Sequence, residues 1–360
     1  MRNIIFALSV IASTTISCMQ SNEFYNPGNV YNIKNTIKYD TLKFQKCYEV
    51  NLLKPYLYSI DDYLIIKQAR KDSVFTILNM EKDSFVTTFG EYGHAVNEFI
   101  AIQPWIYACR GEDGTPLLYV PEVKTTKVID LKKSIKENRC VVRNIIKEKS
   151  DMLFFHKYHI GKDWDFIYKT VSYEDARDKV YVQPEFSMEG KEKYSWEIYP
   201  NIITPAFSNL MDGAYANKII VKPDRKKIIE TLVFIDLTNI FDLETKKTIG
   251  IKGEDSYTFD YINSSMNEQN VRKELRMYNL TACASDKYFI LLKDGGLCEE
   301  VARESKDEGF SIIHLYDWDG NLKKAYVLDR DIYEIAYHEK SKSLYCLGNS
   351  NKLYKYQLSK

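Results

Sequence analysis

The chain has no excess of charge of either sign: among its 360 residues, Lys plus Arg and Asp plus Glu each number 50. A protein that binds nucleic acid needs an excess of basic residues to neutralise phosphates, so we expect no nucleic-acid partner. The sequence also lacks a basic run that would hold it on an anionic bilayer. Beyond Cys18, no apolar run reaches the roughly 20 residues that a membrane-spanning helix needs.

The residue patterns of metal, cofactor and covalent catalytic sites are missing as well. Only five histidines occur, none in an HExxH pattern, and no two cysteines stand in CxxC spacing. His156 and His159 are three residues apart, which places them on opposite faces of a strand. No phosphate-binding glycine motif, GxSxG or SxxK is present. We therefore expect no metal and no cofactor, and we assign no catalytic residue.

The first residues have the pattern of an export signal. Arg2 precedes the apolar run Ile4–Ala12, and the small residues STTIS lead to Cys18. A charged start, an apolar run of about 7–15 residues and small residues before the cleavage site define a secretory signal peptide. The run is too short for a transmembrane anchor, and the abrupt polar stretch after Cys18 argues against a buried core helix.

The segment Thr15-Ile16-Ser17-Cys18 resembles the lipobox of bacterial lipoproteins, with Thr15 at the position where Leu is usual. This resemblance implies that residues 1–17 are a signal peptide and that Cys18 carries the lipid. Acyl chains contribute about 0.8 kcal/mol per buried CH₂, so they can hold a protein at a membrane without a spanning helix. We expect a lipoprotein of the outer membrane, on either face, with a flexible leader over residues 18–40.

Aromatic residues dominate the remainder of the sequence. There are 28 Tyr, 17 Phe and 4 Trp, against 15 Gly and 9 Pro. Short runs such as VFTILNM, TLVFIDL and SLYCLG recur, many of them alternating apolar with polar residues, which is typical of strands. Turn signals of the Asp-Gly type separate them. The best candidate for a helix is Asn263–Met277, as an excursion between strands.

These strands fall into repeating units that restart near residues 53, 104, 152, 210, 280 and 332. The spacing of roughly 45–60 residues is close to the length of a four-stranded propeller blade. Six such units fill the chain after the leader. The fold predicted for residues 41–360 is therefore all-β, a six-bladed β-propeller. The alternative is a sandwich of two sheets, which would be unusually large.

Two segments carry a family resemblance. Residues 89–99, FGEYGHAVNEF, resemble the FGxxGxGPxEF element of NHL-like and TolB-like propellers, although Ala95 and Val96 replace its Gly-Pro. Residues 312–358 resemble the closing blades of the TolB-like six-bladed propeller lipoproteins of Bacteroidetes. The resemblance implies the fold and an envelope location. It implies no site residue, because the role of that family is undefined.

Three glycines in these segments are interpreted as turn residues. Gly90 and Gly93 are expected to have positive φ in the crossing between blades. Gly320, in Asp319-Gly320-Asn321, suits a two-residue hairpin with a type I′ turn. The same segment is not a calcium loop, because Gly and Glu are not at the required positions.

The last unit lacks one strand. Only three strands follow residue 332, whereas residues 41–50, TLKFQKCYEV, form a strand-like run without a local partner. We predict that this N-terminal strand closes the ring by joining the C-terminal blade, because closure removes exposed sheet edges. Cys47 and Cys346 would then share a blade. Buried thiols are the default for the six cysteines after Cys18, and one or two disulfides remain open.

For function, the sequence favours a binding or interaction module with a protein or glycan ligand. Trp164 and Trp196 are weak candidates for ligand binding, since an aromatic side chain among carboxylates can stack on a sugar or anchor a peptide. The other interpretation is that they pack one blade on the next. Two alternatives stay open: a lyase or glycoside hydrolase with a site at the central channel, and a scaffold subunit of an envelope assembly.

Overall fold

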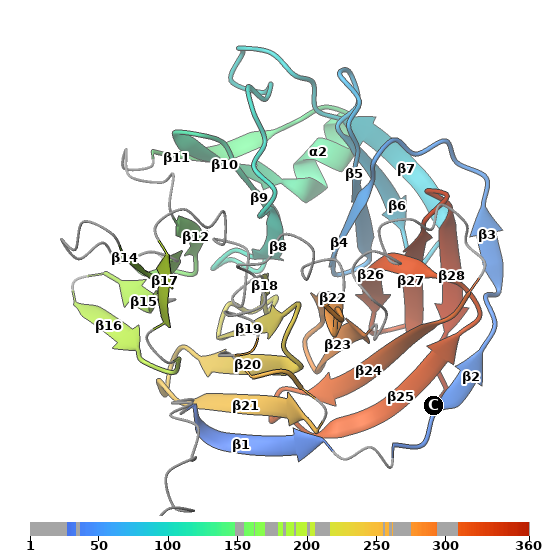
Figure 1. Cartoon of the computed structure of the whole chain (residues 1–360). Helices are drawn as coiled ribbons and strands as arrows, with labels where there is room; N and C mark the ends of the chain where they lie inside the picture. Colours follow the sequence, from blue (N-terminus) through green and yellow to red (C-terminus); the bar gives the residue numbers. More distant parts are fainter. Residues whose placement is uncertain are drawn as a thin grey trace, which may run out of the picture.

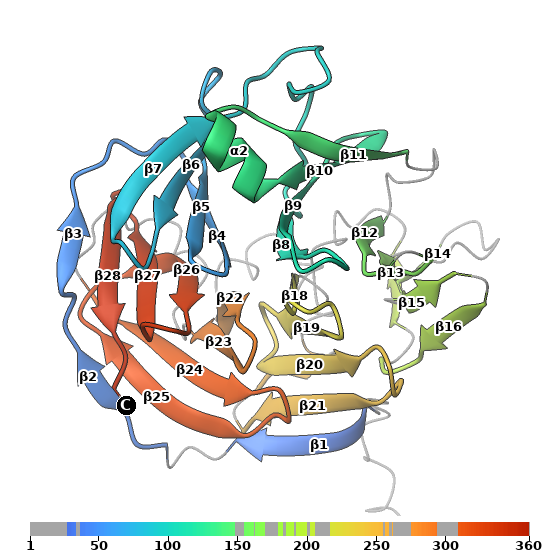
Figure 2. The same ribbon diagram turned by 180° about the vertical axis from the view of Figure 1, so that it is seen from behind.

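Six sheets, antiparallel except for an outer parallel strand in two of them, stand around a common centre in the computed structural model, which Figures 1 and 2 show from opposite ends of the ring. The structure describes residues 27–33, 37–147, 155–161, 163–169, 179–182, 185–190, 192–199, 202–205, 217–254, 256–258, 261, 275–293 and 309–359. The sheets follow one another along the chain, each running from the centre of the ring outward. The predicted six-bladed β-propeller is confirmed.

The first three blades come from the N-terminal half of the chain. Blade 1 contains β4 (Tyr56–Ile60), β5 (Tyr63–Lys67), β6 (Phe75–Asn79) and β7 (Ser84–Phe89). Blade 2 contains β8 (Tyr107–Arg110), β9 (Pro116–Pro121), β10 (Thr125–Asp130), α2 (Leu131–Glu137) and β11 (Val142–Lys147). Blade 3 contains β12 (Phe155–His159), β13 (Asp165–Lys169), β15 (Glu185–Glu189) and β16 (Lys193–Trp196), while β14 (Lys179–Val182) and β17 (Ile202–Pro205) form a separate pair.

The last three blades also use strands from the N-terminal segment. Blade 4 contains β18 (Asn217–Val221), β19 (Lys227–Leu232), β20 (Leu237–Asp242), β21 (Thr248–Gly253) and β1 (Gly28–Ile33). Blade 5 contains β22 (Asn279–Ala284), β23 (Tyr288–Lys293), β24 (Ser311–Asp317), β25 (Leu322–Leu328) and β2 (Asp40–Leu42). Blade 6 contains β26 (Ile332–His338), β27 (Ser343–Gly348), β28 (Leu353–Gln357) and β3 (Lys46–Tyr48).

The hydrophobic core lies between neighbouring blades. Phe289 of blade 5 packs in one cluster with Ile229 of blade 4, and Tyr345 of blade 6 shares another with Leu64 of blade 1. A middle strand is thus covered on both faces, and all six residues of β27 are buried. Each large side chain buried in this way contributes about 1.5–3 kcal/mol. This two-sided burial is the physical reason for the abundance of aromatic residues.

The N-terminal segment wraps around the outside of three blades (Figure 1). β3 pairs antiparallel with β28, so the predicted closure of the C-terminal blade is confirmed, although only residues 46–48 of the predicted strand 41–50 join that blade. Upstream, β1 lies parallel to β21 and β2 lies parallel to β25. The structure therefore differs from the flexible leader expected for residues 18–40, because residues 28–33 continue the sheet of blade 4.

The cysteine pair that the closure brings into one blade is not bonded. Cys47 lies opposite Tyr354, which lies opposite Cys346 on its other side. Two strand spacings separate the Cα atoms of Cys47 and Cys346 by about 10 Å, too far for a disulfide. None of the five cysteines among the described residues is in a disulfide.

The turn glycines agree with expectation in part. Gly90 has φ +86°, as predicted, and Gly320 has φ +84°, whereas Gly93 is not in the positive-φ region, so that prediction is wrong. A side chain at Gly93 would instead collide with the carboxylate of Glu98. The turn at Gly320 is not type I′ either. Only Gly320 has positive φ there, and its N–H donates to Asp317 O over 3.1 Å.

The helices also differ from expectation. α2 was not predicted, and it begins where the side chain of Asp130 accepts a hydrogen bond from Lys133 N. The predicted helix Asn263–Met277 lies largely outside the described residues, and residues 275–277 at its end are not helical. Within the described part of the chain, no helix is long and apolar enough to cross a membrane.

Candidate functional site: the channel mouth

A cavity of about 310 Å³ opens at one end of the ring, where the turns between first and second strands of blades 1, 2, 4, 5 and 6 converge. We call this cavity the channel mouth. Its polar lining includes Asp61, Asp62, Arg110, Asp286, Glu339 and Lys340. Every innermost strand ends at this side of the ring. Side chains near the ends of these strands therefore meet in the cavity from five different blades.

A second, smaller cavity lies in the central channel next to the mouth. Its lining is mostly apolar and includes Leu57, Ile106, Ile219, Ala282 and Ile335. The free volume of about 50 Å³ compares with about 30 Å³ for one water molecule in the liquid. The mouth is therefore a polar depression above an apolar floor.

Blade 3 is set back from this centre. Arg110 N of blade 2 donates to Pro223 O of blade 4 over 2.8 Å, so these two blades meet directly. In Figures 1 and 2, β12 lies farther from the centre than β8 and β18. The described turn residues of blade 3 consequently do not line the mouth.

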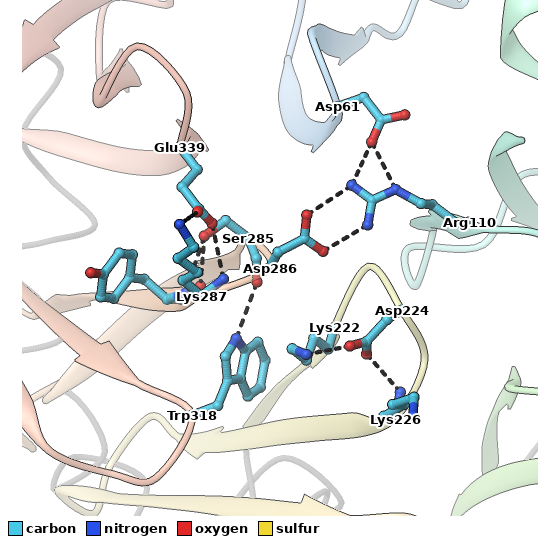
Figure 3. Close-up of polar contacts among 11 residues, drawn as sticks. Asp61, Arg110, Lys222, Asp224, Lys226, Ser285, Asp286, Lys287, Trp318 and Glu339 are labelled. Atoms are coloured by element: carbon cyan, nitrogen blue, oxygen red, sulfur yellow. Dashed lines mark hydrogen bonds and ion pairs between the residues drawn. The ribbon is translucent and has the colours of Figure 1, made fainter. Parts of the chain in front are cut away.

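Arg110 is the central side chain of the mouth (Figure 3). Its Nε and Nη2 donate to Asp61 Oδ1 of blade 1 over 2.9 and 2.6 Å. Its Nη1 and Nη2 donate to the two oxygens of Asp286 of blade 5 over 2.7 and 2.9 Å. The guanidinium fork matches a carboxylate in this two-point geometry. One side chain thus connects blades 1, 2 and 5, and it holds the pKa of Asp286 below the ordinary value.

Further polar contacts complete a circuit around the mouth. His338 of blade 6 is buried, with Nε2 at 3.0 Å from Asp62 Oδ1 and Nδ1 at 2.6 Å from Ser341 Oγ. Because an ionised carboxylate only accepts, Nε2–H is the donor to Asp62. The backbone N–H of Lys287 donates to Glu339 Oε2 over 2.9 Å, which joins blades 5 and 6. The circuit runs through blades 1, 2, 5 and 6.

A second group of contacts positions the turns of blades 4 and 5 (Figure 3). Trp318 Nε1 donates to Ser285 O over 3.1 Å, and the ammonium of Lys222 lies 5.7 Å from the centre of a Trp318 ring. Lys222 also pairs with Asp224, which accepts from Lys226 N over 2.9 Å. The hydrogen bond from Trp318 to Ser285 O therefore fixes the backbone of the turn that carries Asp286.

The two tryptophans selected from the sequence lie elsewhere. Trp196 is 4% exposed, and its Nε1 donates to Lys246 O of blade 4 over 2.9 Å. Trp164 is half-buried, with Lys246 Nζ 5.3 Å from its ring. Both side chains thus pack blade 3 on blade 4, and neither lines the mouth. Cys18 lies outside the described residues.

Sequence reasoning missed the residues of the mouth, although a signal for them exists. The charged residues of the mouth all stand at the end of an innermost strand or within two residues after it: Asp61, Asp62, Arg110, Asp286 and Glu339. Aligning the blades by their innermost strands would have shown that charged residues recur near the ends of these strands. That recurrence identifies this end of the ring as a candidate site. That comparison needs the strand register, which the weak self-similarity of the units did not supply.

The electrostatics of the mouth can be compared with those of a glycosidase. A glycosidase needs one carboxylic acid with a raised pKa beside a second carboxylate. Arg110 instead lowers the pKa of Asp286. Among the described residues, no group of three or more His, Cys, Asp or Glu is arranged to hold a metal ion. The carbohydrate-active alternative therefore gains no support from these side chains.

Comparison with known proteins identifies the class. Residues 34–340 match the model of the TolB-like six-bladed propeller family, described as "TolB-like 6-blade propeller-like". The chain belongs to this family. No curated protein matches it.

Two solved structures from Bacteroides are similar in fold. A member of the DUF4221 family from Bacteroides vulgatus is 11% identical, with a TM-score of 0.51, over 89% of this chain and 95% of that one. A putative exported protein from Bacteroides fragilis is 8% identical, with a TM-score of 0.51, over 92% of this chain and all of that one. At these identities the likeness concerns the fold alone.

Proposed function

We propose that this protein is a lipid-anchored binding module of the cell envelope that receives its ligand at the channel mouth. The observation that carries the proposal is the cavity itself, a polar hollow built by turns of five blades above an apolar floor. Concave sites with a few convergent polar groups are the usual places of ligand binding. The interblade contacts of Arg110 hold the cavity in shape before a ligand arrives.

The envelope location is supported by the sequence and by the similar structures. Cys18 follows a signal-like segment, and one similar protein is described as exported. We expect Cys18→Ser to abolish labelling by a fatty-acid analogue and to release the protein to the soluble fraction. A Cys18→Ser protein that still sediments with membranes and resists carbonate extraction would refute the anchor.

Binding at the mouth is tested by co-purification from detergent-solubilised membranes. Lys340→Trp places a bulky side chain at the rim of the mouth, where the native Lys340 side chain is 62% exposed. The matched control is Lys352→Trp, at an exposed position in the β27–β28 turn on the opposite face. We expect the first variant to lose molecules that the wild type retains, and the control to keep them. Equal retention by all three proteins would refute binding at the mouth.

A further inference from the structure

The charges in the channel mouth are unequal. Four carboxylates, those of Asp61, Asp62, Asp286 and Glu339, face two cations, Arg110 and Lys340. Both cations are already engaged, Arg110 by two carboxylates and Lys340 by Glu81, at 2.6 Å. Lys287, outside the lining, pairs with Glu339 at 3.5 Å. Asp61, Asp62 and Asp286 therefore share one cation, Arg110, and two negative charges remain in excess within the cavity.

Two carboxylate oxygens are available to a ligand. Arg110 contacts only Oδ1 of Asp61, and His338 contacts only Oδ1 of Asp62. Within the described residues, Oδ2 of each has no hydrogen bond or ion pair. The side chains are 27% and 38% exposed, so an incoming donor can reach them at little desolvation cost.

An anionic ligand is disfavoured by the same arrangement. To reach Arg110 it must displace Asp286 from a two-point contact with both distances under 3.0 Å. The released carboxylate would then be unpaired in a cavity that already has excess negative charge. A cation instead adds to the circuit without breaking any of its contacts, since Oδ2 of Asp61 and Asp62 is free to accept.

The remainder of the lining limits the shape of the ligand. Pro223 and Ala284, which also line the apolar cavity in the channel, give the mouth its apolar floor. Its 310 Å³ corresponds to about ten water molecules at roughly 30 Å³ each. A charged head on a short hydrocarbon chain fits this combination, because such groups bury the chain and keep the head in polar surroundings.

Resting on the proposed binding role, we propose that the channel mouth receives an organic cation, a primary ammonium or guanidinium group on an aliphatic stem. Asp61 and Asp62 accept hydrogen bonds from the charged head, and the stem lies on the apolar floor. The cation is a small amine or a basic side chain of a polypeptide, because both present this chemistry.

Titration calorimetry on the mature full-length protein tests the charge of the ligand. The cationic probes are Nα-acetyl-lysine methylamide and Nα-acetyl-arginine methylamide. Their neutral counterparts are the Nε-acetylated lysine and citrulline compounds, and the anionic probe is the glutamate compound. We expect the cationic probes to bind at least tenfold more tightly than the others, and more weakly as salt rises. Equal binding of the neutral compounds, preference for glutamate, or no binding of any cation would overturn the proposal.

A pair of variants tests the location. Asp62→Asn removes one negative charge but keeps an oxygen that can accept from His338, and we expect a tenfold loss of affinity for the cations. Asp319→Asn is the control, since Asp319 is 79% exposed on the same face and does not line the cavity. Equal affinity of the Asp62→Asn variant and the wild type would overturn the assignment. The co-purification result does not depend on ligand charge, so the binding role stands or fails separately.

The two sources of the cation are separated by a lysine placed between glycines in a pentapeptide. Binding of this peptide as tightly as the single residue assigns the site to a polypeptide side chain. Binding restricted to a free alkylamine such as butylamine assigns it to a small molecule. If neither the peptide nor butylamine binds, the proposal that the mouth receives an organic cation is overturned.

Discussion

Glu230 is a buried carboxyl group whose ionisation is predicted to limit stability at neutral pH. It lies on β19 with no exposed surface, facing the start of blade 4 and the end of blade 3. Its Oε2 accepts from Tyr199 OH over 2.6 Å and from Asn239 Nδ2 over 2.9 Å, and its Oε1 accepts from Asn217 Nδ2 over 2.7 Å. Burial raises its pKa to about 7, because loss of hydration outweighs these three hydrogen bonds.

The direction and size of the effect follow from this shift. The folded pKa lies above the unfolded value of 4.5, so the folded state binds a proton that the unfolded state has lost between about pH 4.5 and 7. Stability from this group is complete below pH 4.5 and is lost as the pH rises to 7. At 1.36 kcal/mol per pKa unit, the loss is about 3 kcal/mol.

Glu230→Gln keeps the shape and most of the hydrogen bonding but has no proton to lose. Urea denaturation at pH 5 and pH 8 measures the free energy of unfolding of both proteins. We expect the variant to gain most of the 3 kcal/mol relative to the wild type between these pH values. Glu244→Gln is the control, because its side chain is 63% exposed and pairs with Lys226 at the surface. The reasoning would be refuted if the difference in free energy of unfolding between wild type and variant were the same at pH 5 and pH 8.

Two further predictions concern closure and turn geometry. Deleting residues 40–50 removes β2 of blade 5 together with the outer strand of blade 6 and buried Tyr48, and should lower the Tm by about 10 °C and cause aggregation. Deletion of residues 28–33, an exposed strand, should have a smaller effect in the same melting assay; equal effects would contradict closure by β3. Gly90→Ala should cost about 2–3 kcal/mol, because φ is +86° and the new Cβ would lie 3.0 Å from the Phe99 ring. Gly114→Ala, at φ +75° in open space, should cost about 1 kcal/mol, and equal costs in urea denaturation would show that Phe99 gives way.

The number of blades and their order could be predicted from the sequence. Strand formation depends on short-range alternation and on aromatic and β-branched content, both of which can be read locally. The predicted restarts at 53, 104, 152, 210, 280 and 332 lie within seven residues of the first residues of β4, β8, β12, β18, β22 and β26. Closure of the ring was predictable too. The last blade lacks a fourth strand and the N-terminal strand lacks a local partner, so pairing the two satisfies both.

The edge strands β1 and β2 could not be predicted in the same way. Residues 28–33 are mostly exposed, so the sequence has no buried face to mark a strand. Their pairing partners, β21 and β25, lie more than 200 residues away. The pairing depends on backbone hydrogen bonds, which are the same in every sequence, and on a few packed side chains such as Ile33 and Leu42.

The channel mouth was decided by the tertiary structure alone. Arg110 and Asp286 are 176 residues apart, and neither residue carries a local pattern that names the other. They meet because closure of the ring brings the ends of innermost strands from five blades around one axis. Local alternation determines that a segment forms a strand and which side chains share its face. Which charged residues at the ends of different strands become neighbours depends on the number of blades and on the setback of blade 3, which are properties of the closed ring.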